Sequence, residues 1–404
     1  MFYISFLAVI LFQGIHGAYV EIEYSWSNIT YEGLDIKSYK PRYNVPTAFA
    51  YDAVNHKLFL TIPRRLPYVP YTVAELDTIR HPGFPVERAP QLSKFSGKSK
   101  KDFVPVYQPV IDECRRLWIL DVGAIEYNGD DANKYPKQKP ALIVHDLTKN
   151  NNPEIARYEI PKNVAAKPTA FGGFAVDVNK KNGDCSQTFV YITNFEENSL
   201  VVFNQKTKTS WKFTDKTFRP DKESTFSHLG DQTTYKVGIF GITLGDRDKK
   251  GDRPAYYIAG SSTKVYSINT KQLKTKGTKL KPKLHGDRGK HTDAIALAYD
   301  AKHRVIFFAE SDTRQVSCWH IDMPLKPENT DVIYSYARFI FGTDISIDSE
   351  NNLWFLSNGY PPIENAEKLK FYERKIRLMR VDTDIVLKHA KCNLNYKKPQ
   401  EIPV

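Results

Sequence analysis

The sequence predicts an all-β protein, a six-bladed β-propeller with a central ligand channel, because one phrase recurs along the whole chain. The phrase is a short alternating strand that usually closes with Asp, then a turn, then a strongly apolar strand. Its six copies begin at Thr47, Tyr107, Phe171, Phe240, Asp293 and Phe341. The first strands close at Asp52, Asp112, Asp177, Asp246, Asp300 and Asp348, with successive gaps of 60, 65, 69, 54 and 48 residues. A gap of this size fits a four-stranded blade with its loops.

The second strand of each copy is a run of β-branched and aromatic residues, as at 190–192 and 305–308, which is typical of strands buried between blades. Helical periodicity is weak outside residues 366–374. A closed ring removes exposed sheet edges, and it usually closes by pairing strands from both ends of the chain. Residues 24–29 are therefore expected to complete the blade that begins at Phe341. Two unrelated β-sandwiches are the alternative, but they do not explain why the phrase recurs without a linker.

Composition excludes several classes of protein. The chain has 404 residues, 41% of them hydrophobic and 26% charged, with a mean hydropathy of -0.47. These values exclude disordered, collagen-like and membrane-bundle proteins.

The first 17 residues are predicted to be a secretory signal peptide. They contain no Lys, Arg, Asp or Glu, and an apolar stretch from Phe2 to Ile15 ends at the small residues Gly17 and Ala18, although the usual basic segment is absent. The stretch is shorter than the roughly 20 residues that cross a bilayer, and no later segment approaches that length. The mature chain, residues 18–404, is expected to be one soluble, secreted, monomeric propeller domain without a membrane partner.

The four cysteines are Cys114, Cys185, Cys318 and Cys392. They are too sparse for a disulfide scaffold and too widely spaced for a zinc knuckle or a redox pair. Two disulfides are the expectation in an oxidising compartment, and three connectivities are open. Asn28-Ile29-Thr30 is a sequon and predicts N-glycosylation at Asn28.

Motifs for catalysis are missing from the sequence. It contains no GxSxG, HExxH, Walker A loop or GxGxxG before a helix, so no catalytic residue, cofactor or metal site is predicted. The histidines are scattered, and His145, His285 and His291 are expected to be surface or loop residues. The six closing Asp residues are expected to cap turns rather than bind calcium.

The chain is basic, with 58 Lys and Arg against 46 Asp and Glu and a formal net charge of +12. Residues 271–290 contain eight Lys or Arg and one Asp, which predicts a solvated loop or edge strand, or alternatively a weak binding patch for a heparin-like polyanion. The segment lacks aromatic residues for stacking, which argues against a nucleic-acid partner.

A small-molecule site is expected at one mouth of the channel, where side chains from all blades converge. In the last repeat, Thr343 starts one strand and Asn358 to Tyr360 end the next, antiparallel one, so these residues are expected at the same rim. Neutral oxygen acceptors beside aromatic rings suit a primary ammonium that carries an aryl group. The alternative is that Asn358-Gly359 forms only a turn.

Several strings together resemble the yellow and major royal jelly protein family, and within it the salivary proteins of blood-feeding sand flies. They are YQPVIDECRRLWILDVG, FGGFAVDV, FGITLGDRD, GSSTKVYS, DAIALAYD and FGTDISIDS. The resemblance runs from about Tyr19 to the C-terminus. It implies a six-bladed propeller, sequential disulfides and secretion in saliva. It also implies a central pocket that sequesters serotonin, the catecholamines noradrenaline, adrenaline and dopamine, and sometimes histamine.

The resemblance places the amine-binding positions on Thr343, Asn358 and Tyr360. Thr343 Oγ1, the Asn358 side-chain oxygen and the main-chain carbonyl of Tyr360 would accept hydrogen bonds from the ammonium. Phe341 is a further candidate, and Phe171, Phe240 and Tyr107 are secondary candidates for the walls around the ring.

The same family also suggests a dopachrome-converting enzyme, but the named trio supplies no acid or base for proton transfer. The expectation is therefore a non-enzymatic amine scavenger whose basic excess lies away from the amine mouth.

Overall fold

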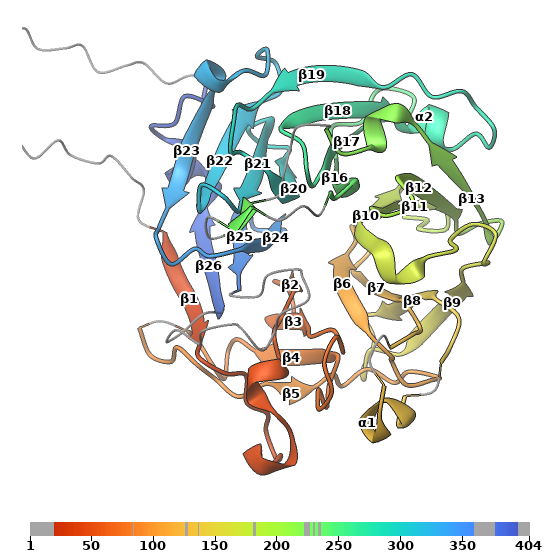
Figure 1. Cartoon of the computed structure of the whole chain (residues 1–404), viewed down its shortest axis with the longest axis vertical. Helices are drawn as coiled ribbons and strands as arrows, with labels where there is room; N and C mark the ends of the chain where they lie inside the picture. The colour runs from red at the N-terminus through yellow and green to blue at the C-terminus, as the bar shows by residue number, and fades with distance from the viewer. Residues whose placement is uncertain are drawn as a thin grey trace, which may run out of the picture.

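The computed structural model describes residues 20–83, 85–125, 128–135, 137–180, 183–221, 227–228, 231–232, 236–358 and 376–394. It confirms the predicted six-bladed β-propeller (Figure 1). The innermost strands of the blades are β2 (Ala48–Asp52), β6 (Val106–Ile111), β10 (Phe171–Val178), β16 (Ile239–Leu244), β20 (Ala294–Asp300) and β24 (Gly342–Ile347).

Each blade is a four-stranded antiparallel sheet built outward from its innermost strand. Blade 1 adds β3 (Lys57–Thr61), β4 (Val73–Asp77) and β5 (Ser93–Lys94), and blade 2 adds β7 (Arg116–Asp121), β8 (Ala141–Asp146) and β9 (Glu154–Glu159). Blade 3 adds β11 (Thr188–Asn194), β12 (Ser199–Asn204) and β13 (Thr209–Thr214), and blade 4 adds β17 (Pro254–Ala259), β18 (Lys264–Asn269) and β19 (Lys283–Asp287). Blade 5 adds β21 (Val305–Glu310), β22 (Gln315–His320) and β23 (Thr330–Ser335).

Blade 6 is completed by both ends of the chain, as predicted. Its outer strands are β25 (Asn352–Ser357), β26 (Ile376–Asp382) and the N-terminal strand β1 (Glu21–Trp26). Trp26 pairs with Ile376 and Glu21 pairs with Arg380. Figure 1 shows the red β1 beside the blue β26. The closing strand begins three residues earlier than the predicted 24–29.

Short elements occupy the connections. They are α1 (Asp130–Asn133), α2 (Thr270–Leu273), α3 (Thr383–Leu387) and the strand pair β14 (Ser227–His228) and β15 (Asp231–Gln232). Among the described helices, none has the length and apolar character of a membrane span. The predicted signal peptide, residues 1–17, lies outside the described residues.

The core lies between the blades. Every pair of adjacent blades shares a cluster of buried apolar side chains. Trp118, Trp319 and Trp354 are at most 1% exposed in these clusters. Fully burying a large apolar side chain contributes about 1.5–3 kcal/mol, so packing of blade against blade holds the ring and fixes the inner strands.

Hydrogen bonds from second strands also join neighbouring inner strands. Thr61 Oγ1 donates to the carbonyl of Tyr107 at 2.9 Å, and Thr193 Oγ1 donates to the carbonyl of Phe240 at 2.6 Å. A Cβ on Gly172 would stand 2.7 Å from Thr193 Oγ1, so the position requires a residue without a side chain. These contacts fix the rim at which the inner strands begin.

The closing Asp residues lie at the opposite rim, and four of them cap turns as predicted. Asp52, Asp112, Asp300 and Asp348 each accept hydrogen bonds from backbone N–H groups of the following turn. Asp177 and Asp246 instead bind side chains from the next blade, Arg253 and Arg304 respectively.

The structure contains the disulfides Cys114–Cys185 and Cys318–Cys392, the pairing that the family resemblance implies. They enclose sequence separations of 71 and 74 residues. Loops of this length correspond to about 4 kcal/mol of stabilisation each on the chain-entropy account. The first bond ties blade 2 to blade 3, and the second ties the segment after α3 to β22.

The expectation that His145 is a surface or loop residue is wrong. His145 lies in β8 and is fully buried, with its ring packed edge-on against Phe95. Its Nδ1 lies 2.7 Å from the carbonyl of Asn152. Burial lowers the pKa of this imidazole, so the neutral form fits the apolar surroundings. Of the other two, His285 is half-buried in β19 and His291 is exposed.

Candidate ligand-binding site

A cavity of about 470 Å³ follows the axis of the ring, and all six inner strands contribute to its wall. This volume lies within the range of about 300–1,000 Å³ that is usual for small-molecule sites. The inner strands all run in the same direction along the axis. Their first residues therefore gather at one end, the aromatic mouth, and the closing Asp residues gather at the other, the Asp mouth.

The structure brings the sequence-predicted site residues together, except for Tyr360, which lies outside the described residues. Thr343, Asn358 and Phe341 line the cavity, and so do the secondary candidates Phe171, Phe240 and Tyr107. Asn358 is fully buried and Phe341 is 3% exposed, whereas Thr343 is half-buried. Their roles toward a ligand stay predictions.

Asn358 has a structural contact beside its predicted binding role. Its Nδ2 donates to the carbonyl of Pro46 at 2.6 Å and lies 3.5 Å from Thr343 Oγ1. The contact with Pro46 joins blade 6 to blade 1. Because the amide nitrogen faces Pro46 and Thr343, the amide oxygen is the atom of this side chain that suits a cation. A hydroxyl oxygen has two lone pairs, so Thr343 Oγ1 can accept from Asn358 and from a ligand together.

Aromatic and aliphatic groups form one wall of the cavity. The rings of Phe195 and Phe240 stack with centroids 5.4 Å apart, and Phe240 also packs against Ile295 and Phe341. Phe195 was missed by the sequence reasoning. It directly follows β11, and the end of a second strand reaches the same mouth as Asn358 does, so strand polarity could have identified it.

Tyr107 carries a cation on its ring. The Arg65 guanidinium lies 4.9 Å from the Tyr107 ring centroid, and both residues line the cavity. The expectation that basic groups avoid the amine mouth therefore has an exception in Arg65.

The most informative residue that the sequence reasoning missed is Asp344. Its carboxylate is buried in the cavity wall and accepts hydrogen bonds from the backbone N–H groups of Phe49 and Ile345, each at 3.0 Å. The Gln108 side chain also hydrogen-bonds to it, and Gln108 Oε1 accepts from the N–H of Phe174 at 3.0 Å. Asp344 and Gln108 thus connect the inner strands of blades 6, 1, 2 and 3.

Burial raises the pKa of Asp344 to about 7, because these hydrogen bonds only partly offset the loss of hydration. The sequence repeat contained a signal that could have identified Asp344. The position four residues before each closing Asp holds Ala48, Gln108, Gly173, Ile242, Ala296 and Asp344. Only the last copy places an ionisable group there.

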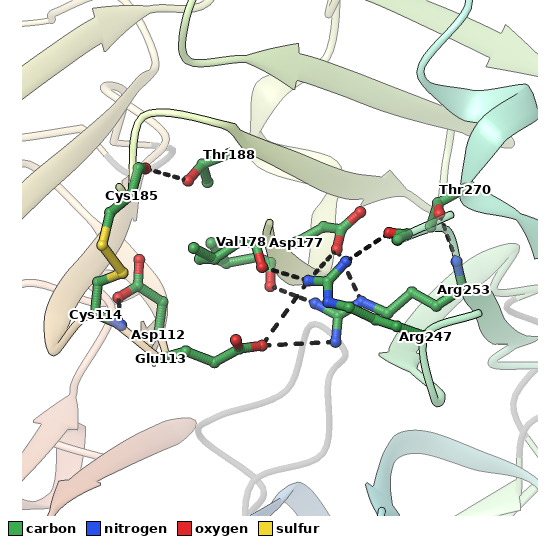
Figure 2. Close-up of polar contacts among 12 residues, drawn as sticks. Asp112, Glu113, Cys114, Asp177, Val178, Cys185, Thr188, Arg247, Arg253 and Thr270 are labelled. Carbon is green, nitrogen blue, oxygen red and sulfur yellow. Dashed lines mark hydrogen bonds and ion pairs between the residues drawn. A yellow bond between two sulfur atoms is a disulfide. The ribbon is translucent and has the colours of Figure 1, made fainter. Parts of the chain in front are cut away.

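The Asp mouth is lined by ion pairs and by the rings of Tyr51 and Tyr299. Figure 2 shows the Asp177 carboxylate between Arg247 and Arg253, at 2.7 and 2.8 Å, with Glu113 near both guanidinium groups. Glu113 and Arg253 lie in the cavity wall. Within the described ranges, no three His, Cys, Asp or Glu side chains cluster in a way that could hold a metal ion.

The chain is thus a closed six-bladed β-propeller with an axial cavity lined by aromatic, aliphatic and polar groups. The family described as "Major royal jelly protein" matches residues 104–392, and the chain belongs to this family.

Relatives of nearly full length are yellow-related salivary proteins of sand flies. LJM17 of Lutzomyia longipalpis is 61% identical over 100% of both chains. ASP4 of Phlebotomus orientalis is 58% identical, covering 98% of this chain and 99% of the relative. LJM11 of Lutzomyia longipalpis is 52% identical, covering 97% and 99%. These relatives are named as salivary proteins and not as enzymes.

Proposed function

We propose that the protein is secreted in saliva and binds small aromatic amines in its axial cavity without changing them. Serotonin, noradrenaline, adrenaline, dopamine and histamine are the candidate ligands. Sequestering such mediators would damp haemostasis and inflammation in a bitten host. The observation that carries the proposal is the convergence of Thr343, Asn358 and the buried Asp344 carboxyl beside aromatic walls.

The chemistry of the wall matches each part of such a ligand. An ammonium carries three N–H donors, and the Thr343 hydroxyl and the Asn358 amide oxygen are acceptors for two of them. The ionised form of Asp344 adds a buried negative charge. The aryl group would pack against Phe240 and its neighbours, where an aromatic contact adds about 0.5–1.5 kcal/mol beyond the area that it buries.

Sequestration demands high affinity. Nanomolar binding corresponds to about -12 kcal/mol, or about -1 kcal/mol for each of a dozen ligand atoms, which is near the ceiling for small ligands. Such efficiency requires a preformed site, since little binding energy can be lost to ordering the protein. The inner strands meet this requirement because buried clusters and hydrogen bonds between blades hold them.

Titration calorimetry with serotonin, noradrenaline and histamine tests the proposal, and Thr343→Val is the informative variant. Removing a hydrogen bond to a charged group costs about 1.5–3 kcal/mol, so we expect serotonin to bind roughly 10- to 100-fold more weakly. Thr343→Ser keeps the hydroxyl and should bind within about threefold of wild type. Asn358→Ala is a poorer test, because it also removes the contact with Pro46. Folded wild-type protein that gives no heat with any of the three amines would refute the proposal.

The buried carboxyl supports one second candidate, a proton-transfer enzyme acting on an aromatic substrate such as dopachrome. A group with a pKa near 7 suits general acid or base catalysis at neutral pH. However, both Asp344 oxygens accept backbone hydrogen bonds, which favours a fixed counter-charge over a proton carrier. Dopachrome turnover above background that Asp344→Asn abolishes would establish the enzyme instead.

A further inference from the structure

A basic face covers blades 3 and 4 at the Asp mouth. Antiparallel strands place four connections there, namely residues 179–187, 205–208, 245–253 and 270–282. Their described residues include twelve Lys or Arg and four Asp, a net charge of +8. At the aromatic mouth, the connections between the second and third strands of blades 1 to 5 are residues 62–72, 122–140, 195–198, 260–263 and 311–314. Their described residues include six Lys or Arg and five Asp or Glu, a net charge of +1.

The basic face is wider than the Lys-rich segment that the sequence singled out. Residues 271–290 are not one loop, because they form most of α2, a connection and then the edge strand β19. Two of their eight cations are committed to the fold. Lys274 pairs with Asp177 and Asp252, and Arg288 is 2% exposed and donates to the carbonyl of Thr292. The exposed lysines of α2 and of the connection to β19 join the positive charge of blade 3 and of the loop before β17.

Nine lysines of the basic face are exposed, and among the described residues none of them forms an ion pair within 4.0 Å. They are Lys180, Lys206, Lys208, Lys249, Lys250, Lys271, Lys276, Lys279 and Lys281. The ion pairs of this face use Arg247, Arg253 and Lys274 instead. The exposed ammonium groups are therefore available to an external anion.

Buried contacts hold the connections of the basic face in fixed positions. The Asp177 carboxylate accepts from Arg247, Arg253 and Lys274, and Figure 2 shows the two arginines converging on it. Burial alone would raise the pKa of Asp177, but these three cations together lower it. Trp211 of β13 donates to the carbonyl of Leu273 at 3.1 Å, which ties α2 to blade 3. The lysines thus project from a rigid base.

The composition of the face selects the kind of polyanion. The four connections contain no Phe, Tyr or Trp on which bases could stack, which argues against single-stranded nucleic acid. None of the large exposed apolar side chains lies on them, so nothing would insert into a lipid surface. Flexible lysines spread over two blades suit a linear chain with repeated anionic groups, since many weak contacts then act together.

We propose that the basic face of blades 3 and 4 binds a sulfated polysaccharide chain, at the end of the propeller opposite the aromatic mouth. Binding there would hold the secreted protein on extracellular polysaccharide while the aromatic mouth stays open. The inference does not rest on amine binding, because a different surface and a ligand of opposite charge are involved.

Retention on immobilised heparin and titration with a heparin oligosaccharide, both at about 0.15 M salt, test the proposal. The test variant combines Lys271→Gln, Lys276→Gln, Lys279→Gln and Lys281→Gln. The control combines Lys37→Gln, Lys162→Gln, Lys388→Gln and Lys391→Gln, which removes the same charge from exposed sites elsewhere. We expect heparin affinity to fall at least about tenfold in the first variant and less than about twofold in the control.

Three results would overturn the inference. One is wild-type protein that does not bind heparin at this salt concentration, and another is an equal loss of affinity in the two quadruple variants. The third is binding of oligothymidylate, or of vesicles containing phosphatidylserine, as tightly as heparin. Thermal unfolding of each variant checks that the fold is intact. Titration of the Lys271 to Lys281 variant with serotonin measures amine binding separately from heparin binding. A failure of this inference can therefore be distinguished from a failure of the proposed function.

Discussion

Serotonin binding is expected to weaken about 20-fold between pH 8 and pH 5.5, because the complex favours the ionised form of Asp344. Burial raises the pKa of Asp344 to about 7, so the carboxyl is almost fully protonated at the lower pH. An ammonium ligand favours the ionised form. Binding at the lower pH therefore has to release a proton, which reduces the apparent affinity.

The size of this pH effect follows from the position of Asp344 next to Thr343. An ammonium held by Thr343 would lie on the order of 6 Å from the Asp344 carboxylate, since consecutive Cα atoms are about 3.8 Å apart. At an effective dielectric constant of about 20, the attraction is about 3 kcal/mol, which lowers the carboxyl pKa by about two units. The ligand, an amine with a pKa near 10 like that of lysine, stays protonated throughout this range.

Calorimetry in two buffers with different ionisation enthalpies measures both the affinity and the number of protons released. We expect about 0.7 of a proton released at about pH 5.5 and about half a proton at pH 7. Asp344→Asn should abolish the proton release and the pH dependence, and should bind serotonin on the order of 100-fold more weakly at pH 8. Among the described residues, no histidine lines the cavity to confuse the titration. Equal wild-type affinity at both pH values, with no proton exchanged, would show that the ligand does not sense Asp344.

Three further predictions concern stability and charge. The native pKa of Asp344 exceeds its usual value, so the native state binds more protons than the unfolded state between about pH 4 and 7. The free energy of unfolding should then fall by up to about 4 kcal/mol as the pH rises from about 4 to 7. Asp121, whose pKa burial raises to about 6, acts in the same direction. Denaturant unfolding at the two pH values, with Asp344→Asn for comparison, measures this change in stability. Thr193→Val should lower the free energy of unfolding by about 1–3 kcal/mol, because it removes the hydroxyl that lies between the carbonyls of Gly173 and Phe240 and donates its single hydrogen there. Thr193→Ser should restore most of this stability in the same denaturant titration. Arg65→Gln should tighten serotonin binding about fourfold in calorimetry, since it removes a cation from the cavity wall.

The fold could be predicted from sequence because a propeller repeats its local pattern. Each blade needs only a strand that closes with Asp, a turn and an apolar strand, and this phrase is visible without any knowledge of distant contacts. The closing strand was placed three residues late, since β1 stands outside the repeats and is positioned by its register with β26. The Lys-rich segment was likewise read as one unit, although contacts with blades 3 and 5 divide it.

The site could be predicted only in part. Thr343 and Asn358 follow from strand polarity within a single blade, so one repeat was enough to bring them together. Asp344 depends on Phe49, which lies 295 positions away, and on Gln108 of blade 2. A single Asp within a strand reads as solvent-facing in the sequence. Only closure of the ring, which brings the first blade against the last, makes this carboxyl buried.

The common direction of the inner strands explains how a chain with a net charge of +12 could hold a cation on its axis. Six residues of strand separate the two mouths by about 20 Å, which is more than twice the Debye length of about 8 Å at physiological salt. The charge of the basic face is therefore largely screened from the aromatic mouth. Arg65 brings a cation into the cavity wall at that mouth, beside Tyr107. If Arg65→Gln left serotonin affinity unchanged, the separation of the basic face from the aromatic mouth would not be what permits amine binding. Packing of the ligand against the aromatic wall would then have to supply nearly all of the affinity.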